Sequence, residues 1–242
     1  MTYYLPELKP SSIEFPSPSQ AMSEPNGLLA FGGDLQPERL LSAYQHGIFP
    51  WYSDNDPIMW WSPTPRAVID PKTFSPAKSL IKFQKKARYI VTINHTTHSV
   101  IELCAASRGS DGTWITPEMI DAYQTLANQR ICHSVEVWEE QELIGGLYGI
   151  QIGTLFCGES MFSLKSNASK IALWYFCHHF SNQGGELIDC QMTNPHLSTL
   201  GATEQTRDSF MATLSSLKDK KVSIDCYSRQ VIPSPSRKNT HE

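Results

Sequence analysis

A short apolar stretch near the C-terminal end carries two polar side chains that could take part in chemistry. Residues 184–193 read GGELIDCQMT, and Asp189 and Gln191 interrupt an otherwise apolar run. If the run is a strand, residues two apart lie on the same face. A carboxylate and an amide in an apolar strand lower stability unless both are hydrogen-bonded. The pair therefore either has a structural role, with its hydrogen bonds made inside the fold, or is part of a catalytic site.

A second carboxylate stands at the end of another apolar strand, in the sequence GESMFS. Its neighbour Ser160 has no partner histidine in a recognisable motif, which argues against a serine esterase. Glu159 and Asp189 together would give an apolar cavity an acidic end. Such a cavity suits a cationic group and can orient an amine.

Basic side chains are densest in the sequence KSLIKFQKKAR. A solvated helix face is the ordinary explanation of such a run. In a chain of net charge −4 it is also the densest basic site, and it could contact a phosphate backbone. Its members are Lys78, Lys82, Lys85, Lys86 and Arg88.

Four tryptophans lie in loops rich in glycine and proline, at Trp51, Trp60, Trp61 and Trp114. Large aromatic side chains in such loops either pack two domains together or stack on a flat ligand. Nucleic-acid bases stack on aromatic rings at about 1–3 kcal/mol each. Composition alone does not separate these two interpretations.

Motifs for nucleotides, metals and disulfides are missing from the sequence. IGGLYG does not match GxGxxG and lies in a strand pattern, so its glycines predict bulges or a close ligand approach. His95 and His98 have no accompanying zinc-site spacing, and no metal is assigned. The six cysteines form no CxxC pair and are expected to be reduced and mostly buried.

Length and composition indicate ordinary globular material. The 242 residues, 40% hydrophobic and 18% charged, fit one large domain or a small one joined to a larger one. The start, MTYYLPELKP, lacks the regions of a signal peptide. No apolar run approaches the roughly 20 residues that span a bilayer. We therefore expect a cytoplasmic protein without contact to a membrane.

The first 65 residues differ in texture from the rest of the chain. They hold 10 of the 16 prolines and three of the six tryptophans, and only PERLLSAYQHG reads as a clear helix. Linkers are not this aromatic. We expect residues 1–65 to form a small irregular domain docked onto residues 66–242.

Residues 66–242 show a regular pattern of helices and strands. The expected order is strand, helices, an antiparallel meander, helix, strand and helix, with a frayed tail after about residue 228. This is an α+β layout with a mixed sheet, as in the GNAT-like (acyl-CoA N-acyltransferase-like) fold. Helices are expected at 75–89, 99–107, 117–129, 167–183 and 206–219, and strands at 89–93, 134–140, 142–153, 154–162 and 186–191.

Longer strings in the chain resemble those of bacterial leucyl/phenylalanyl-tRNA–protein transferases. The likeness begins in FPSPSQAMSEPNGLLAFGGDLQPERL and continues through SAYQHGIFPWYSDNDPIMWWSPTPRAVI. It extends through GTWIT, LFCGESMFS, NASK and LIDCQ, in order from about residue 13 to about residue 204. These strings are far more specific than any short motif above.

The resemblance implies an aminoacyltransferase with a GNAT-like larger domain. Such an enzyme moves Leu or Phe, less readily Met, from aminoacyl-tRNA to the N-terminal Arg or Lys of a protein. The product is then marked for ATP-dependent proteolysis, as in the N-end rule. An aminoacyl ester is already activated, so no cofactor or metal is expected. We expect a monomer.

The resemblance also implies roles for single residues. Asp189 accepts a hydrogen bond from Gln191, whose side chain contacts the attacking α-amine, while Glu159 binds the basic N-terminal residue. Trp51 and Trp114 flank the 3′-terminal adenosine, and the basic helix around Lys85 and Lys86 contacts tRNA. The pocket for the transferred side chain, too narrow at Cβ for Val or Ile, is lined by Leu147, Phe156, Leu173, Phe176 and Ile188.

Strand alternation conflicts with one of these assignments. Ile188 points away from the face of Asp189 and Gln191, yet the resemblance places all three at one site. We therefore predict a bend or bulge near Asp189. Two other functions stay open, a CoA-dependent N-acyltransferase and a non-enzymatic tRNA-binding module. The joint ESMFSLKSNASK argues against the first, because it lacks the glycines of a pyrophosphate-binding turn.

Overall fold

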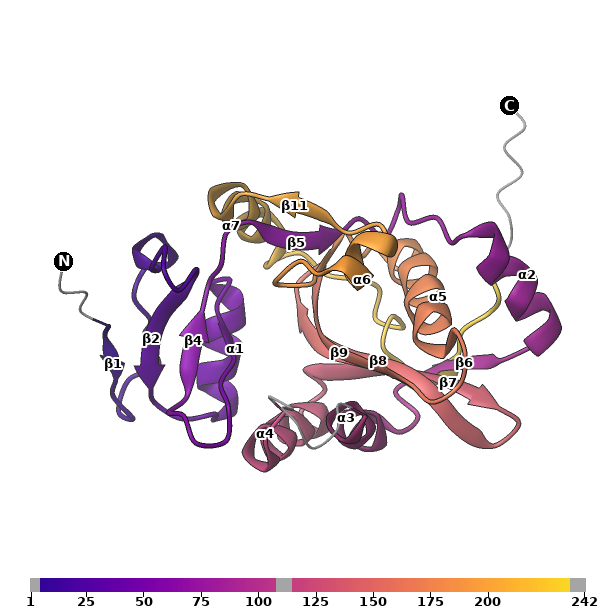
Figure 1. The fold of residues 1–242 in the computed structure, drawn as a ribbon, viewed down its shortest axis with the longest axis horizontal. Coiled ribbons are helices and arrows are strands. Elements are labelled where there is room, and N and C mark those ends of the chain that lie inside the picture. The colour runs from indigo at the N-terminus through magenta and orange to yellow at the C-terminus, as the bar shows by residue number, and fades with distance from the viewer. Residues whose placement is uncertain (1–4, 108–114, 236–242) are drawn as a thin grey trace.

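The computed structural model describes residues 5–107 and 115–235. Its strands form two sheets, a four-stranded one in the order β1-β2-β4-β3 and an eight-stranded one in the order β11-β5-β10-β9-β8-β7-β6-β12. Figure 1 shows the smaller sheet at one end of an elongated molecule and the larger sheet filling the rest. The smaller sheet ends at Trp61 and the larger one begins at Arg66.

The N-terminal segment is more regular than its loop-like sequence predicts. The 3-10 helix Pro18–Gln20 precedes β2, and the predicted helix follows as α1 (Pro37–Gln45), with proline in its first turn. The strands are too short to show an alternating pattern in the sequence. They are β1 (Glu7–Leu8), β2 (Leu28–Gly32), β3 (Phe49–Pro50) and β4 (Met59–Trp61).

The larger sheet is built on the predicted meander. Strands β7 (Cys132–Glu139), β8 (Glu142–Ile152) and β9 (Leu155–Ser163) pair antiparallel in sequence order. Helix α5 (Ala168–Asn182) then leads to β10 (Leu187–Asp189), which pairs parallel to β9. A meander, a crossover helix and a parallel strand are the predicted α+β arrangement, which is therefore confirmed.

Short strands complete the sheet on both sides of this core. β5 (Arg66–Ile69) lies between β10 and β11 (Thr203–Gln205), and it pairs antiparallel with both. On the other side β6 (Ile90–Ile93) pairs with β7, and β12 (Gln230–Val231) covers its outer edge.

Helices cover both faces of the larger sheet. Helix α5 packs on one face, and α3 (Thr97–Ala106) and α4 (Pro117–Asn128) pack on the other (Figure 1). The side chain of Thr116 accepts the amide of Met119 and caps α4, as Thr-Pro at its start predicts. The remaining helices are α2 (Lys78–Ala87) beside α5, α6 (Pro195–Thr199) and α7 (Arg207–Leu217).

Two irregularities shape the sheet where β9 and β10 separate. Gly149 pairs with Gly158 and Tyr148 pairs with Ser160, so Glu159 is the extra residue of a β-bulge. A Cβ atom at Gly149 would lie 2.1 Å from the carbonyl oxygen of Cys157, which explains the need for glycine there. The glycine-rich strand β8 has its own bulge against β7, where Ile144 is the extra residue between Leu143 and Gly145, so the predicted bulge is confirmed there.

The predicted bend near Asp189 is also present. β10 ends at Asp189, and Gln191 has a left-handed backbone with φ of 56°. Residues 189 and 191 therefore do not share one face of a regular strand, and the alternation that suggested this was wrong. A left-handed residue turns the chain, so the side chain of Gln191 leaves the strand direction.

The C-terminal segment corrects the expectation of a frayed tail after about residue 228. β12 pairs with the edge strand β6, and the amide of Ile232 donates to the carbonyl of Val91 at 2.8 Å. The side chain of Ile232 is only 2% exposed. A strand of two residues has no periodicity that sequence reading can detect.

All six cysteines are free thiols, as predicted, and five of them are buried. Cys190 is partly exposed. Among the helices of the described residues, none has the length and apolar character needed to cross a membrane.

Candidate active site

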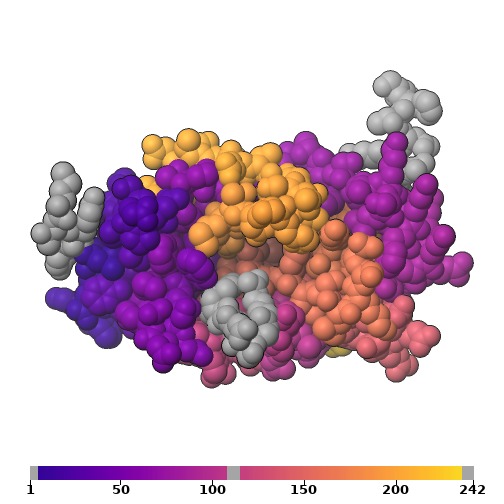
Figure 2. All heavy atoms as spheres, in the orientation of Figure 1, coloured from indigo at the N-terminus to yellow at the C-terminus, as the bar shows by residue number. Residues whose placement is uncertain are grey.

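A cavity of about 790 Å³ lies where β8, β9, β10 and α5 meet the loop that carries α6. Figure 2 shows the surface hollowed beneath the orange atoms of the α6 segment. The wall has an apolar end and a polar end. Besides the site residues treated below, it includes Phe49, Pro50, Met161, Asn194 and His196.

The apolar end contains every residue that was predicted to hold the transferred side chain. The rings of Phe156 and Phe176 lie 4.5 Å apart at a tilt of 59°, and Ile188 pairs with Phe156 across the β9–β10 ladder. Each of these side chains is at most 4% exposed. The cavity-lining set is Leu147, Phe156, Leu173, Phe176 and Ile188.

The polar end is formed by Glu159 and Gln191. Nε2 of Gln191 donates to Oε1 of Glu159 at 3.1 Å. The hydroxyl of Tyr123 donates to Oε2 of Glu159 at 3.0 Å, and it is itself hydrogen-bonded to the hydroxyl of Tyr44. The β-bulge brings Glu159 to this position, and the left-handed bend brings Gln191 to meet it. The two irregularities together build the polar end of the cavity.

The surroundings of Glu159 favour its neutral form more than water does. Burial raises the pKa of this carboxyl to about 7, and the hydrogen bonds from the tyrosines oppose the rise. The nearby carboxylate of Asp189 raises the pKa further, and the guanidinium of Arg66 lowers it. A carboxyl with such a pKa can gain and lose a proton near neutral pH, as a general acid–base group must.

Asp189 does not accept the side-chain amide of Gln191, which corrects the predicted pairing. Its carboxylate is fully buried and accepts hydrogen bonds from Nε of Arg66 at 2.8 Å and from Nη2 at 2.7 Å. Gln191 reaches Asp189 only through its backbone amide, at 2.9 Å from Oδ1. Asp189 is not among the cavity-lining residues. Within the described residues, Asp189 therefore forms a buried ion pair with Arg66, and we assign it a structural role.

Sequence reading missed Arg66, although this residue holds the junction of the two sheets. Its guanidinium lies 5.0 Å from the ring centroid of Phe49 and 4.5 Å from that of Phe210. Nη1 donates to the carbonyl of Gly47 at 3.0 Å. A single arginine following Thr-Pro in the sequence gives no signal of burial, because its partners are distant in the chain.

Tyr44 and Tyr123 were also missed. Both occupy apolar positions of predicted helices and are at most 1% exposed, so a core assignment accounts for their pattern. Only the packing of α1 and α4 reveals that their hydroxyls meet below Glu159. Two buried tyrosines in amphipathic helices carry no sequence mark of this contact.

The tryptophans divide into core and cavity residues. Trp60 is fully buried and donates to the carbonyl of Gly32, and Trp61 donates to the carbonyl of Trp51. Trp51 is 37% exposed and lines the cavity, with its ring 5.4 Å from that of Trp61. Its predicted counterpart, Trp114, lies outside the described residues.

The predicted basic residues lie on and just after α2, on the side of α5 away from the smaller sheet (Figure 1). All five are exposed, and Arg88 ends the helix with a left-handed backbone. None of them lines the cavity. They form a separate basic surface, made of Lys78, Lys82, Lys85, Lys86 and Arg88.

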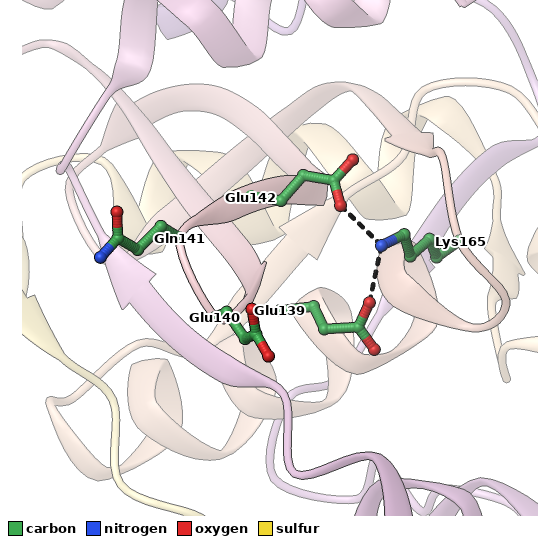
Figure 3. Close-up of a pocket in the computed structure, with 5 residues that line it drawn as sticks. All are labelled: Glu139, Glu140, Gln141, Glu142 and Lys165. Atoms are coloured by element: carbon green, nitrogen blue, oxygen red, sulfur yellow. Dashed lines mark hydrogen bonds and ion pairs between the residues drawn. The ribbon is translucent and has the colours of Figure 1, made fainter.

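A second hollow lies at the turn between β7 and β8 (Figure 3). Nζ of Lys165 lies 2.6 Å from a carboxylate oxygen of Glu139 and 2.6 Å from one of Glu142. These pairs tie the hairpin to the segment before α5. Glu139 and Glu142 thus have a structural partner, and we assign no chemistry to this turn.

Across residues 5–107 and 115–235, no group of three or more His, Cys, Asp or Glu side chains could hold a metal ion.

Two family models match the sequence. The model described as leucyl/phenylalanyl-tRNA protein transferase matches residues 68–215, and the model of the N-terminal domain of that transferase matches residues 33–64. The two matches meet at the junction that Arg66 holds.

Curated relatives are similar over nearly the whole chain. A leucyl/phenylalanyl-tRNA–protein transferase of Vibrio cholerae is 59% identical over 236 residues, which are 98% of this chain and 97% of the relative. One of Vibrio vulnificus is 60% identical over 95% of this chain and 97% of the relative. One of Aliivibrio fischeri is 60% identical over 96% of this chain and 98% of the relative.

Solved structures are more distant. A GCN5-related N-acetyltransferase from Kribbella flavida is 11% identical, with a TM-score of 0.40 over 70% of this chain and 61% of that chain. A conserved protein of unknown function from Bacteroides thetaiotaomicron is 12% identical, with a TM-score of 0.43 over 56% of this chain and 53% of that chain.

Proposed function

The chain belongs to the leucyl/phenylalanyl-tRNA protein transferase family, and on that premise we propose that it transfers Leu or Phe from aminoacyl-tRNA to a protein. It is accordingly a transferase enzyme. The acceptor in this proposal is an N-terminal Arg or Lys, Met is transferred less readily, and the product is marked for ATP-dependent proteolysis. We place the reaction in the cytoplasm and attribute it to a monomer.

The observation that carries this proposal is the division of the cavity into an apolar and a polar end. The apolar end, with the Phe156–Phe176 pair, suits a side chain such as Leu or Phe. Glu159 and Gln191 face the same cavity, where hydrogen-bonding groups can meet an amine. An aminoacyl ester bound between the two ends would present its carbonyl carbon near the acceptor amine.

The chemistry asks little of the protein beyond positioning. An aminoacyl ester is already activated, so the enzyme has to hold ester and amine in attack geometry. It must also manage the proton that the amine loses. In this proposal Asp189 and Arg66 keep the turn at Gln191 in place, and the amide of Gln191 orients the acceptor.

The nucleic acid in this proposal spans two separate surfaces. Trp51 lines the cavity with an exposed ring on which the terminal adenine can stack. The basic surface on α2 would hold the tRNA backbone through charge, without reading its sequence. Trp114 is the proposed second aromatic wall for the adenosine.

The test is a transfer assay with the full-length protein. We expect labelled Leu and Phe to pass from charged tRNA to a peptide that begins with Arg or Lys, and not to a matched peptide that begins with Glu. A known transferase serves as the positive control. No label on the basic peptides while that control works would refute the proposal, and transfer of an acetyl group from acetyl-CoA would support a different acyltransferase.

A further inference from the structure

We propose that Glu159 is the catalytic residue that takes the proton from the acceptor α-amine, and that Tyr123 and Tyr44 are positioning residues behind it. The inference deepens the proposed transfer function and rests on it. It differs from the roles that the family resemblance implies for the two carboxylates. The proton goes to Glu159 and not toward Asp189, and Glu159 does more than bind the basic side chain of the acceptor.

The first step of the argument is access to the substrate. Asp189 is 0% exposed, and both of its carboxylate oxygens accept hydrogen bonds from the guanidinium of Arg66. Glu159 and Gln191 line the cavity, whereas Asp189 does not. An amine in the cavity can therefore meet Glu159 directly, but it can reach Asp189 only through other groups.

The second step is that an amide is a poor relay for a proton. Nε2 of Gln191 already donates to Oε1 of Glu159, which leaves the carbonyl oxygen of the amide as its acceptor for an amine. Gln191 can thus orient the amine by accepting one of its hydrogens. The proton itself needs a group that can hold it, and the carboxylate 3.1 Å from the amide nitrogen is that group.

The third step is that the fold maintains Glu159 from behind. Tyr123 on α4 donates to Oε2, and Tyr44 on α1 bonds to the hydroxyl of Tyr123. Both tyrosines are at most 1% exposed. Because each hydroxyl has one hydrogen, Tyr123 can donate to Glu159 only if Tyr44 donates to Tyr123. This ordered chain favours the carboxylate form that has to accept a proton.

The charged and titratable groups around Glu159 come from every element packed on it. Asp189 on β10 raises the pKa of Glu159 and Arg66 on β5 lowers it. The thiols of Cys132 and Cys157 are also nearby. The pKa of Glu159, raised by burial to about 7, suits a group that must take up and release one proton per turnover near neutral pH.

The proposed step balances in protons and bonds. The neutral amine attacks the ester carbon, a C–N bond forms, and the positively charged nitrogen passes one proton to the carboxylate of Glu159. The tetrahedral intermediate then expels the ribose oxygen. That oxygen takes the proton from the carboxylic acid of Glu159 as the C–O bond breaks. The products are the extended peptide and uncharged tRNA, and Glu159 is again a carboxylate.

The experiment measures kcat and KM for transfer to an Arg-peptide from pH 5.5 to pH 9. For Glu159→Gln we expect kcat to fall by about a hundredfold or more, as for loss of a general base. In the plot of kcat against pH, the decline toward low pH (the acid limb) has one part due to protonation of Glu159 and one due to protonation of the peptide amine. The part due to Glu159 should disappear in this variant, and the part due to the amine should stay. The wild type must transfer label in the same assay, so failure of the transfer function itself would be visible separately.

Tyr123→Phe is the second variant, and it decides the matter if Glu159→Gln does not fold. It removes a hydrogen bond that lowers the pKa of Glu159, so the acid limb should move to higher pH. The variant should be several-fold slower than the wild type at pH 6 and close to it at pH 9. Tyr44→Phe should move the limb in the same direction, because the hydroxyl of Tyr44 also lowers the pKa of Glu159.

Tyr175→Phe is the matched control, because it removes another buried tyrosine hydroxyl, bonded to Gln84 and Ser234 and outside the cavity wall. Its acid limb should match that of the wild type. A Glu159→Gln enzyme with a raised KM and an unchanged kcat would overturn the proposal in favour of side-chain binding. An acid limb that does not move in Tyr123→Phe would overturn it as well.

Discussion

Two carboxylates on neighbouring strands, Asp189 and Glu159, differ in what the fold places around them. Asp189 meets the guanidinium of Arg66 in a two-point contact and is shut off from the cavity. Glu159 meets an amide and a hydroxyl, both neutral donors, and faces the cavity. A buried ion pair maintains structure, whereas a carboxyl with neutral partners keeps the freedom to change its protonation.

The first prediction at this scale concerns Asp189→Asn. Removing one partner of a buried pair leaves Arg66 charged and without its carboxylate, so we expect unfolding to become easier by about 3–5 kcal/mol. Urea titration followed by circular dichroism measures the change. Lys220→Gln, which breaks the exposed pair with Glu186, should leave stability unchanged within error. Equal stability of Asp189→Asn and wild type would contradict the structural role.

A second prediction concerns the size of the apolar end. Leu147→Ala enlarges the pocket, so a Leu side chain should fit more loosely and lose about tenfold in transfer relative to Phe. Competition between Leu-tRNA and Phe-tRNA for one Arg-peptide measures the ratio. Leu147→Met, which conserves volume, should keep the wild-type ratio. An unchanged ratio in Leu147→Ala would remove Leu147 from the pocket.

The residues of the apolar end were assigned from the resemblance to one family, and all five line the cavity. The resemblance placed Gln191 at the site as well, but it paired the amide with the wrong carboxylate. The pairing depends on a bulge at Glu159 and on a left-handed turn at Gln191, and both override strand alternation. Arg66 was invisible for another reason, since its partner Asp189 is 123 residues away.

At the scale of elements, α2 carries basic residues that have no part in the cavity. We expect the double substitution of Lys85 and Lys86 by Ala to weaken tRNA binding. The slope of log K against log salt should become shallower by about 1 for each lysine removed. Filter binding at several salt concentrations measures it.

Lys165→Ala is the control for this prediction, because Lys165 is already paired with Glu139 and Glu142. Its salt slope should equal that of the wild type. A double variant of α2 with an unchanged slope would mean that tRNA binds elsewhere on the protein.

The short strand β12 leads to a prediction about the C-terminal segment. Ile232 follows β12 and is 2% exposed, so Ile232→Ala should lower the free energy of unfolding by about 2–5 kcal/mol. Its neighbour Val231 is 58% exposed, and Val231→Ala should change stability by less than about 0.5 kcal/mol. Thermal denaturation compares them. Equal effects of the two substitutions would mean that the segment is frayed in solution.

Elements of eight or more residues were predictable, whereas the strands of two or three residues, apart from β10, were not. The meander β7–β9, α4 and α5 have periodic patterns and capping signals that sequence reading detects. β11 and β12 are held by pairing with strands that are distant in the sequence. Tertiary contact alone gives them their structure.

At the scale of the whole molecule, the N-terminal segment contributes to the candidate site. α1 supplies Tyr44, the loop before β3 supplies the carbonyl that Arg66 binds, and Trp51 lines the cavity. One apolar core contains Trp60 from the smaller sheet together with Phe210 from α7. The two sheets are therefore bound together both by packing and by the site.

This shared core leads to the last prediction, a single unfolding transition. Tryptophan fluorescence, to which Trp60 and Trp61 contribute, should change at the same urea concentration as the circular dichroism of the whole chain. An earlier fluorescence transition would show that the segment before residue 66 unfolds by itself. In that case it would be an independent domain.

The ion pair of Arg66 and Asp189 also constrains the history open to this sequence. Neither residue can be exchanged for a neutral one without leaving the other as an isolated buried charge. A lineage that replaced the pair by two apolar side chains would have to pass through a poorly folded ancestor, or change both codons at once. The two positions, 123 residues apart in the chain, are expected to be inherited together.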